Sequence, residues 1–219
     1  MSDSPWTPQQ AVPDDLVSYL ENLKVDPPSH KNGFFYAFLR ILFQLKATKR
    51  TGWIDFDVPG PESIADHMYR MSIIAMCNSD ENLDISRCVK MALIHDMAEA
   101  LVGDITPADV SVSKQEKHRR ELATMEYLRD LLTPVNARAA QEIFEIWNEY
   151  EDISTPEAVF VKDVDKFELM VQTLEYERLN KDKDLSRFLT VRSQIKTPQV
   201  SDWADGILEE RKLLWENKS

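Results

Sequence analysis

One apolar stretch of the chain carries four side chains that could do metal or acid–base chemistry. The segment ALIHDMAEALVGDITP, residues 92–107, places His95, Asp96, Glu99 and Asp104 close together. Imidazole and carboxylate groups together can bind a divalent metal ion. A single histidine on an apolar helical face is more often a core residue that a backbone carbonyl satisfies. This segment alone therefore leaves a metal site and ordinary packing both open.

Two positions elsewhere in the chain favour the metal site. His67 lies on the apolar stripe of a predicted helix, and Asp165 has apolar residues four positions to either side in another. A carboxylate buried without a partner would be costly, and a metal ion would remove that cost. Surface exposure is the alternative for Asp165, because the neighbouring positions include several charged residues. The three segments together are harder to explain by packing than any one of them.

The order of these residues resembles a known family. His67, then His95 with Asp96, then Asp165 is similar to the H…HD…D signature of the HD-domain metal-dependent phosphohydrolases, an all-helical superfamily. The segments ESIADHMYRM and ALIHDMAEALVGDITP resemble its 5'-deoxynucleotidase branch, which includes the bacterial YfbR-type enzymes and the eukaryotic HD-domain-containing protein 2 group. The longer motif HDxxExxxxGD is far more specific than the His-Asp pair, and the similarity runs from about residue 33 to 185.

The resemblance implies a ligand set and a reaction. His67, His95, Asp96 and Asp165 match the family's metal ligands. The implied activity is metal-dependent hydrolysis of deoxyribonucleoside 5'-monophosphates to the deoxyribonucleoside and phosphate. A bound divalent ion, Mn²⁺, Co²⁺ or Mg²⁺, would lower the pKa of its water and offset charge on the phosphoryl group.

The acidic residues after the metal ligands match the pair that the family uses around the reacting phosphate. Glu99 and Asp104 would act as acid and base, and either order is open. Some eukaryotic members look able to hold a second ion, and here its ligands would be Glu99, Asp104 and the backbone carbonyl of Ile105. The alternative for Glu99 is a solvent-facing helical residue, and the alternative for Asp104 is a polar residue after a helix end.

Substrate-binding residues are implied at the end of an aromatic-rich helix. Arg50 matches an arginine that contacts the sugar and phosphate of the substrate in the family, with surface solvation as the alternative. Trp53 could line the same pocket, although core packing explains it equally well. The bacterial pattern has a tryptophan directly after the arginine, whereas this chain has Thr51.

Three other functions compete with the deoxynucleotidase. Deoxynucleotide triphosphohydrolases of the superfamily generally need a larger helical chain, and the cyclic-nucleotide phosphodiesterases resemble sites with more histidines than the two on apolar faces here. The third alternative is a non-catalytic nucleotide-binding scaffold on the same helices. A degenerate site would be expected to have lost Glu99 or Asp104, and both are present.

The elements that must position these residues are predicted to be helices. Only five glycines in 219 residues disfavour a turn-dense β fold, and long segments have helical periodicity. Ser63, Ser113, Thr133 and Thr155 are predicted N-caps, and Gly103 is predicted to end a helix in a left-handed conformation. The predicted helices are 14–23, 32–50, 64–77, 86–102, 114–132, 134–150, 156–180, 185–195 and 202–217.

These helices are expected to form one all-α HD-domain bundle. The predicted divisions are an N-terminal tail with a short helix at 1–28, the phosphohydrolase core at 29–185, and a C-terminal helical extension at 186–219 packed on the core. The aromatic-rich helix at 32–50 is expected to be central, because apolar residues cover most of its surface. The family resemblance also implies a homodimer.

Composition limits the partners and the compartment. A net charge of −12 disfavours a nucleic-acid polymer, whose binding draws on Lys and Arg, but it does not exclude one small phosphate compound. No apolar run approaches a membrane span, and no apolar signal segment is found at the start of the sequence. With only Cys77 and Cys88, a reducing, cytoplasmic location is expected, and entry into the nucleus stays open.

Overall fold

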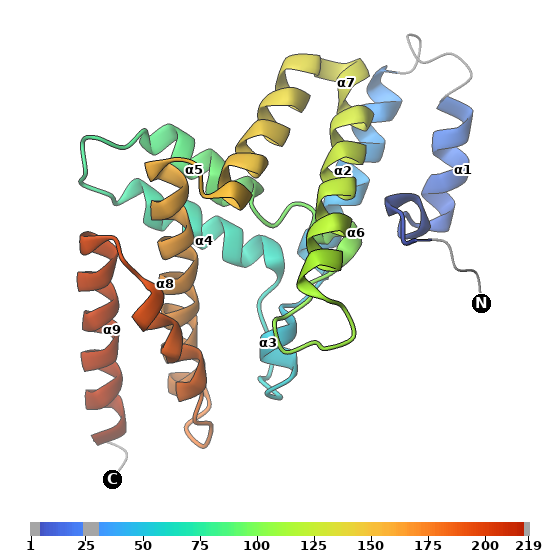
Figure 1. Ribbon diagram of the computed structural model, residues 1–219. Coiled ribbons are helices and arrows are strands. Elements are labelled where there is room, and N and C mark those ends of the chain that lie inside the picture. The colour runs from blue at the N-terminus through green and yellow to red at the C-terminus, as the bar shows by residue number, and fades with distance from the viewer. Residues whose placement is uncertain (1–4, 24–30, 217–219) are drawn as a thin grey trace. The chain divides into compact units, whose positions relative to one another are not determined.

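The structure is a computed structural model that describes residues 5–23 and 31–216 (Figure 1). Parts of the predicted tail, the turn VDPPS after the first helix and the end of the last predicted helix lie outside the described residues. Within the described residues the chain is all-α, as predicted, and its one isolated β-bridge joins Lys49 and Ser63. No helix among them is long and apolar enough to cross a membrane. The elements are η1 (Pro8–Gln10), α1 (Asp14–Leu23), α2 (Lys31–Ala47), α3 (Thr51–Ile54), α4 (Ile64–Met76), α5 (Ile85–Ile94), α6 (Glu99–Val102), α7 (Lys114–Asp152), α8 (Pro156–Leu179), η3 (Ser186–Gln194) and α9 (Pro198–Glu216).

The chain forms two compact units, each built from two stretches of sequence. Unit 1 comprises Met1–Asp66 and Ile94–Asn148, and unit 2 comprises His67–Leu93 and Glu149–Ser219. The domain boundaries that the sequence predicts at residues 28 and 185 stay a prediction.

In unit 1, helix α2 contacts both α1 and α6. Its buried face carries Phe34, Phe38, Ile41 and Leu45. Its opposite face is also apolar but exposed, with Phe35, Leu39 and Phe43 at 44%, 46% and 57% exposure. The expectation that apolar residues would bury most of this helix is therefore wrong for one of its faces.

In unit 2, helix α8 contacts η3 and α9 (Figure 1). Two buried carboxylates of α8, Asp163 and Glu177, accept hydrogen bonds from α9 and from the residues just before it. Asp163 accepts hydrogen bonds from the backbone N–H groups of Lys196 (2.8 Å) and Thr197 (2.7 Å), just before α9 begins. Glu177 accepts from the guanidinium of Arg211 (2.8 Å) and from the indole N–H of Trp215 (3.0 Å). The link to α9 is thus made by hydrogen bonds to two buried carboxylates, one of which is also paired with Arg211.

Three of the four predicted N-caps are confirmed, and one is wrong. The Ser113 hydroxyl accepts from the Glu116 N–H (3.1 Å) at the start of α7. The Thr155 hydroxyl accepts from the Ala158 N–H (3.2 Å) at the start of α8, and the Ser63 hydroxyl accepts from the Asp66 N–H (3.1 Å) at the start of α4. Thr133 does not cap a helix, because its hydroxyl donates to the Arg129 carbonyl (2.7 Å) and α7 continues past it. The interruption lies at Asn136 (φ −155°, ψ 91°), whose side chain accepts from the Ala139 N–H.

The helix predicted over 86–102 is interrupted at the position of greatest interest. Helix α5 ends at Ile94, and α6 begins at Glu99. Between them the backbone hydrogen bonds join residues three positions apart, as in a 3-10 helix, and not four as in an α-helix. Glu99 N–H donates to the Asp96 carbonyl (3.0 Å), and Ala100 N–H donates to the Met97 carbonyl (3.2 Å). In such a tighter turn, side chains three positions apart lie over one another, so Asp96 and Glu99 share one side.

Candidate active site

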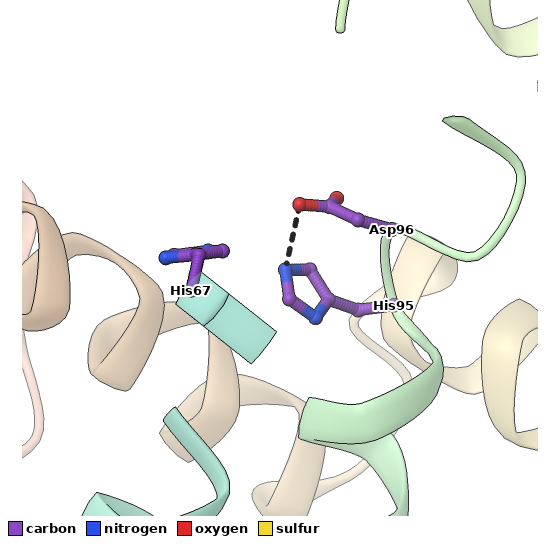
Figure 2. Close-up of side chains that lie close together, drawn as sticks. All are labelled: His67, His95 and Asp96. Atoms are coloured by element: carbon purple, nitrogen blue, oxygen red, sulfur yellow. Dashed lines mark ion pairs between the residues drawn. The ribbon is translucent and has the colours of Figure 1, made fainter. Parts of the chain in front are cut away.

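Unit 1 brings His95, Asp96 and Arg50 together. His95 follows the last residue of α5 and is buried, while Asp96 is partly exposed. The His95 Nε2 atom lies 3.1 Å from Asp96 Oδ2, the pair that Figure 2 marks with a dashed line. The Arg50 guanidinium lies 3.4 Å from the same carboxylate oxygen. The His95–Asp96 pair and Arg50, which were predicted from two separate segments, therefore meet within this unit.

Glu99 is a buried carboxylate on the side of the turn that it shares with Asp96. Its side chain is 4% exposed, and its Oε2 atom has no hydrogen-bond partner among the described residues. Burial raises the pKa of Glu99 well above its usual value, and the neighbouring Asp96 and Asp104 raise it further. The alternative of a solvent-facing glutamate is therefore wrong, and this environment disfavours the charged form of the carboxyl group more than water does.

Asp104 is held by the residue that follows Arg50. Gly103 has φ 80°, so the predicted helix end with a positive φ is confirmed, although its ψ of 167° is not that of a left-handed helix. Just beyond it, the Asp104 carboxylate accepts from the Thr51 backbone N–H (2.6 Å), and the Thr51 hydroxyl donates to the Asp104 carbonyl (2.7 Å). Thr51, at the position where the bacterial pattern has tryptophan, thus fixes a predicted catalytic residue.

Lys117, from the charged start of α7, was not identified from the sequence. Its ammonium group donates to the Ile105 carbonyl (2.8 Å) and lies 3.6 Å from Glu99 Oε1 and 3.5 Å from Glu121 Oε1. Burial would lower its pKa, but Glu99, Glu121 and two further carboxylates raise it, so the side chain stays charged. In the sequence Lys117 is one cation within KQEKHRRE, and nothing there separates it from a solvated lysine.

Unit 2 brings His67 and Asp165 together. His67 on α4 is fully buried, with its Nε2 atom 3.2 Å from Asp165 Oδ1 on α8. The Asp165 side chain is 32% exposed, which is neither the buried position nor the free surface that the sequence left open. The hydroxyl of Tyr150 donates to its other oxygen (3.3 Å). Both predicted ligands of this unit thus offer atoms to one point.

A second carboxylate, Glu168, orients the His67 ring. Its Oε2 atom lies 2.5 Å from His67 Nδ1, and its Oε1 atom accepts from Arg70 Nε at 2.8 Å. A carboxylate that already accepts from a guanidinium accepts the Nδ1–H of the imidazole too, which leaves Nε2 with its lone pair for a metal ion. Glu168 was not predicted as a site residue, because in the sequence it is one of several charged residues around Asp165.

Trp53 is almost fully buried, whereas a residue that lines an open pocket would be partly exposed. Its side chain is buried, and its indole N–H donates to Glu62 Oε1 (3.0 Å) in unit 1. This arrangement favours core packing, and a contact between Trp53 and substrate stays a prediction.

Each unit contributes donor atoms of the kinds that bind divalent metal ions. In unit 1 the His95 imidazole lies beside the Asp96 carboxylate, and in unit 2 the His67 imidazole lies beside the Asp165 carboxylate. Glu168 orients the His67 ring. Nitrogen and oxygen donors of this kind suit first-row divalent ions, and a carboxylate behind the ligating histidine is the usual second layer of such a site. The fold and these groups define a helical protein of the metal-binding class.

Comparison with known proteins gives the family. Residues 42–203 match the HD domain. The chain is 41% identical over 214 residues to 5'-deoxynucleotidase YGK1 of Saccharomyces cerevisiae, covering 97% of this chain and 96% of that protein. It is 50% identical over 180 residues to 5'-deoxynucleotidase hdd1 of Schizosaccharomyces pombe, covering 81% and 90%. The protein belongs to the HD-domain family.

A solved structure agrees with the sequence comparison. The structure of HD domain-containing protein YGK1 superposes with a TM-score of 0.71 at 35% identity, covering 96% of this chain and 99% of that one. The all-helical fold expected from the sequence is therefore confirmed by a structural relative of nearly the same length.

Proposed function

We propose that the protein is a metal-dependent 5'-deoxynucleotidase, which hydrolyses deoxyribonucleoside 5'-monophosphates to the deoxyribonucleoside and phosphate. The family membership and the names of its relatives in two yeasts support this activity. The observation that carries it is the buried Glu99. Its Oε1 atom lies 3.6 Å from the Lys117 ammonium group, but its Oε2 atom has no hydrogen-bond partner among the described residues, and burial raises its pKa. A buried carboxyl group of this kind is typical of a catalytic acid or base.

The proposed metal ligands are His67 and Asp165 of unit 2 with His95 and Asp96 of unit 1. Figure 2 draws three of these four side chains. A bound ion would supply a water of lowered pKa and positive charge for the phosphoryl oxygens. Mn²⁺, Co²⁺ and Mg²⁺ are the candidates, because carboxylates suit Mg²⁺ and Mn²⁺, and imidazole nitrogens suit first-row transition-metal ions.

The protein side chains supply the proton transfers and the positioning. Glu99, whose pKa is raised by burial, is suited to donate a proton to the leaving 5'-oxygen. Asp104, whose carboxylate is fixed by Thr51, would orient the attacking water or accept its proton. Arg50 would bind the substrate phosphate, since its guanidinium lies at Asp96 and offers several N–H donors.

Phosphate release from nucleotides tests this proposal directly. The full chain would be incubated with each of dAMP, dCMP, dGMP, dTMP and dUMP, with Mg²⁺, Mn²⁺ or Co²⁺. We expect phosphate from at least one deoxynucleotide, and none after chelation of the metal. The matching ribonucleotides and dATP serve as comparisons. No release with any combination would contradict the enzyme, and release of deoxyadenosine and inorganic triphosphate from dATP alone would indicate a triphosphohydrolase.

We also infer that the protein is a homodimer. The exposed stripe of α2, Phe35, Leu39 and Phe43, is spaced four residues apart and supports this inference, because such patches on soluble proteins mark interaction surfaces. Light scattering should give a mass near twice 25.4 kDa, and Phe43→Glu should shift it toward one chain. A wild-type mass of one chain at micromolar concentration would contradict the inference.

The proposed location is the cytoplasm. Cys77 is exposed, Cys88 is buried, and both are free thiols. An exposed free thiol is typical of a reducing compartment, which supports this location.

A further inference from the structure

Lys117 occupies the acceptors that a second divalent ion would use. Its ammonium group donates to the Ile105 carbonyl at 2.8 Å and lies 3.6 Å from Glu99 Oε1, all within unit 1. Backbone carbonyls and carboxylates are also the preferred ligands of hard divalent cations. Two of the three groups that could hold a second ion are therefore already engaged by a positive charge that belongs to the protein.

The ammonium group and a second ion cannot share these ligands. A divalent ion bound to the same carbonyl and carboxylate oxygens, at roughly 2.0–2.6 Å from each, would lie within a few ångströms of the ammonium nitrogen. Like charges at that separation repel strongly where water is largely excluded. Glu99 is such a place, since its side chain is 4% exposed and its Oε2 atom has no hydrogen-bond partner among the described residues.

The structure also provides a position to which Lys117 can withdraw. Glu121 lies four residues later on α7, with its Oε1 atom 3.5 Å from the ammonium nitrogen. An oppositely charged pair at this spacing lies along one face of a helix. A rotation of the flexible lysine side chain toward Glu121 would free the Ile105 carbonyl and Glu99 while keeping the ammonium group paired.

We propose that Lys117 is an internal competitor of the second divalent ion: its ammonium group lies at Glu99 and donates to the Ile105 carbonyl until the ion binds, and it then moves to Glu121. This inference rests on the proposed function for the identity of the site, and it goes beyond it by assigning Lys117 and Glu121. It predicts that the second ion is weakened by Lys117, because binding of this ion must displace the ammonium group from Glu99 and the Ile105 carbonyl.

A metal titration of the full chain without nucleotide tests the proposal. Mn²⁺ alone would be titrated into wild type and Lys117→Met by calorimetry, with free Mn²⁺ followed by its magnetic resonance signal. The first ion should bind both proteins equally. The second should bind Lys117→Met at least about tenfold more tightly, which corresponds to about 1.4 kcal/mol. Lys114→Met, which removes an exposed lysine three residues earlier, should leave both steps within twofold of wild type.

Glu121→Gln gives an independent arm. It should weaken the second ion several-fold in the wild-type background, and it should have little effect in the Lys117→Met background, because no lysine is left to withdraw. Equal second-ion affinities in wild type and Lys117→Met would overturn the proposal, as would no second ion in Lys117→Met or an equal effect of Lys114→Met. The first binding step reports on the proposed metal site and the second on Lys117, so the two failures are distinguishable.

Discussion

Replacing Glu99 with glutamine should abolish turnover and, in the metal-free protein, raise the melting temperature at pH 8. The activity should fall at least about a hundredfold, which is the usual contribution of a positioned acid or base. The first metal ion should still bind, because Glu99 is not one of its proposed ligands. Phosphate release and metal content after dialysis would measure these two effects.

The stability effect follows from the pKa of Glu99. Burial, and then Asp96 and Asp104, raise this pKa in the folded chain, so the folded state binds the proton more tightly than the unfolded chain does. Its contribution to stability is fully present below the unfolded pKa, about 4.3, and is lost as the pH rises through the folded value. Glutamine has no charge to bury, so the gain from Glu99→Gln should grow from pH 4.5 to pH 8.

Melting curves in a chelator at these two pH values decide the matter. Each kcal/mol should appear as roughly 2–4 °C in a chain of this size. A gain of equal size at both pH values would mean that charge burial is not the cause. A loss at pH 8 would mean that the Glu99 carboxylate stabilises the fold, which would contradict our account of why the residue is retained.

His95→Ala and Asp165→Ala should each remove both the bound metal and the activity. Each change deletes one of the four proposed ligands, and we expect the remaining ligands to be too few to hold the ion through dialysis. Asp202→Ala, which changes an exposed aspartate at the start of α9, should retain the metal and the activity of wild type. Metal content by elemental analysis and phosphate release are the measurements.

Glu168→Gln should give an intermediate result. Its carboxylate orients the His67 ring and does not itself bind the ion, so affinity for the metal should fall about 10- to 100-fold. An excess of metal should then restore most of the activity, which it cannot do for Asp165→Ala. If Asp165→Ala keeps as much metal as wild type, Asp165 is not a ligand; if Glu168→Gln loses metal irreversibly, Glu168 has been assigned the wrong role.

The positions that the sequence predicts best are those where residue type and helical spacing agree. His67 and Asp165 meet because each occupies an apolar position of a helix, and an ionisable group at such a position is informative. Ser63 and Thr155 cap their helices because a hydroxyl before a helix start satisfies a free N–H group. These features depend on local chemistry, which the sequence contains.

The residues that the sequence does not reveal depend on contacts between distant segments. Lys117 and Glu168 look like solvated charges, and only the fold brings them to Ile105 and His67. The turn at residues 95–98 was missed because apolar residues continue with helical spacing through it, and periodicity does not distinguish a three-residue from a four-residue hydrogen bond. Thr133 has the right type for a cap, but Asn136 takes that role three positions later.

The turn between α5 and α6 sets a rule for how this segment can vary among related chains. Met97 and Ala98 are buried, so small changes of their side chains can be absorbed by packing. Their number cannot change, because removing or adding one residue in a three-residue turn would rotate Glu99 by about 120° relative to Asp96. Substitutions should therefore accumulate between Asp96 and Glu99 in homologous sequences, whereas insertions and deletions should be absent there.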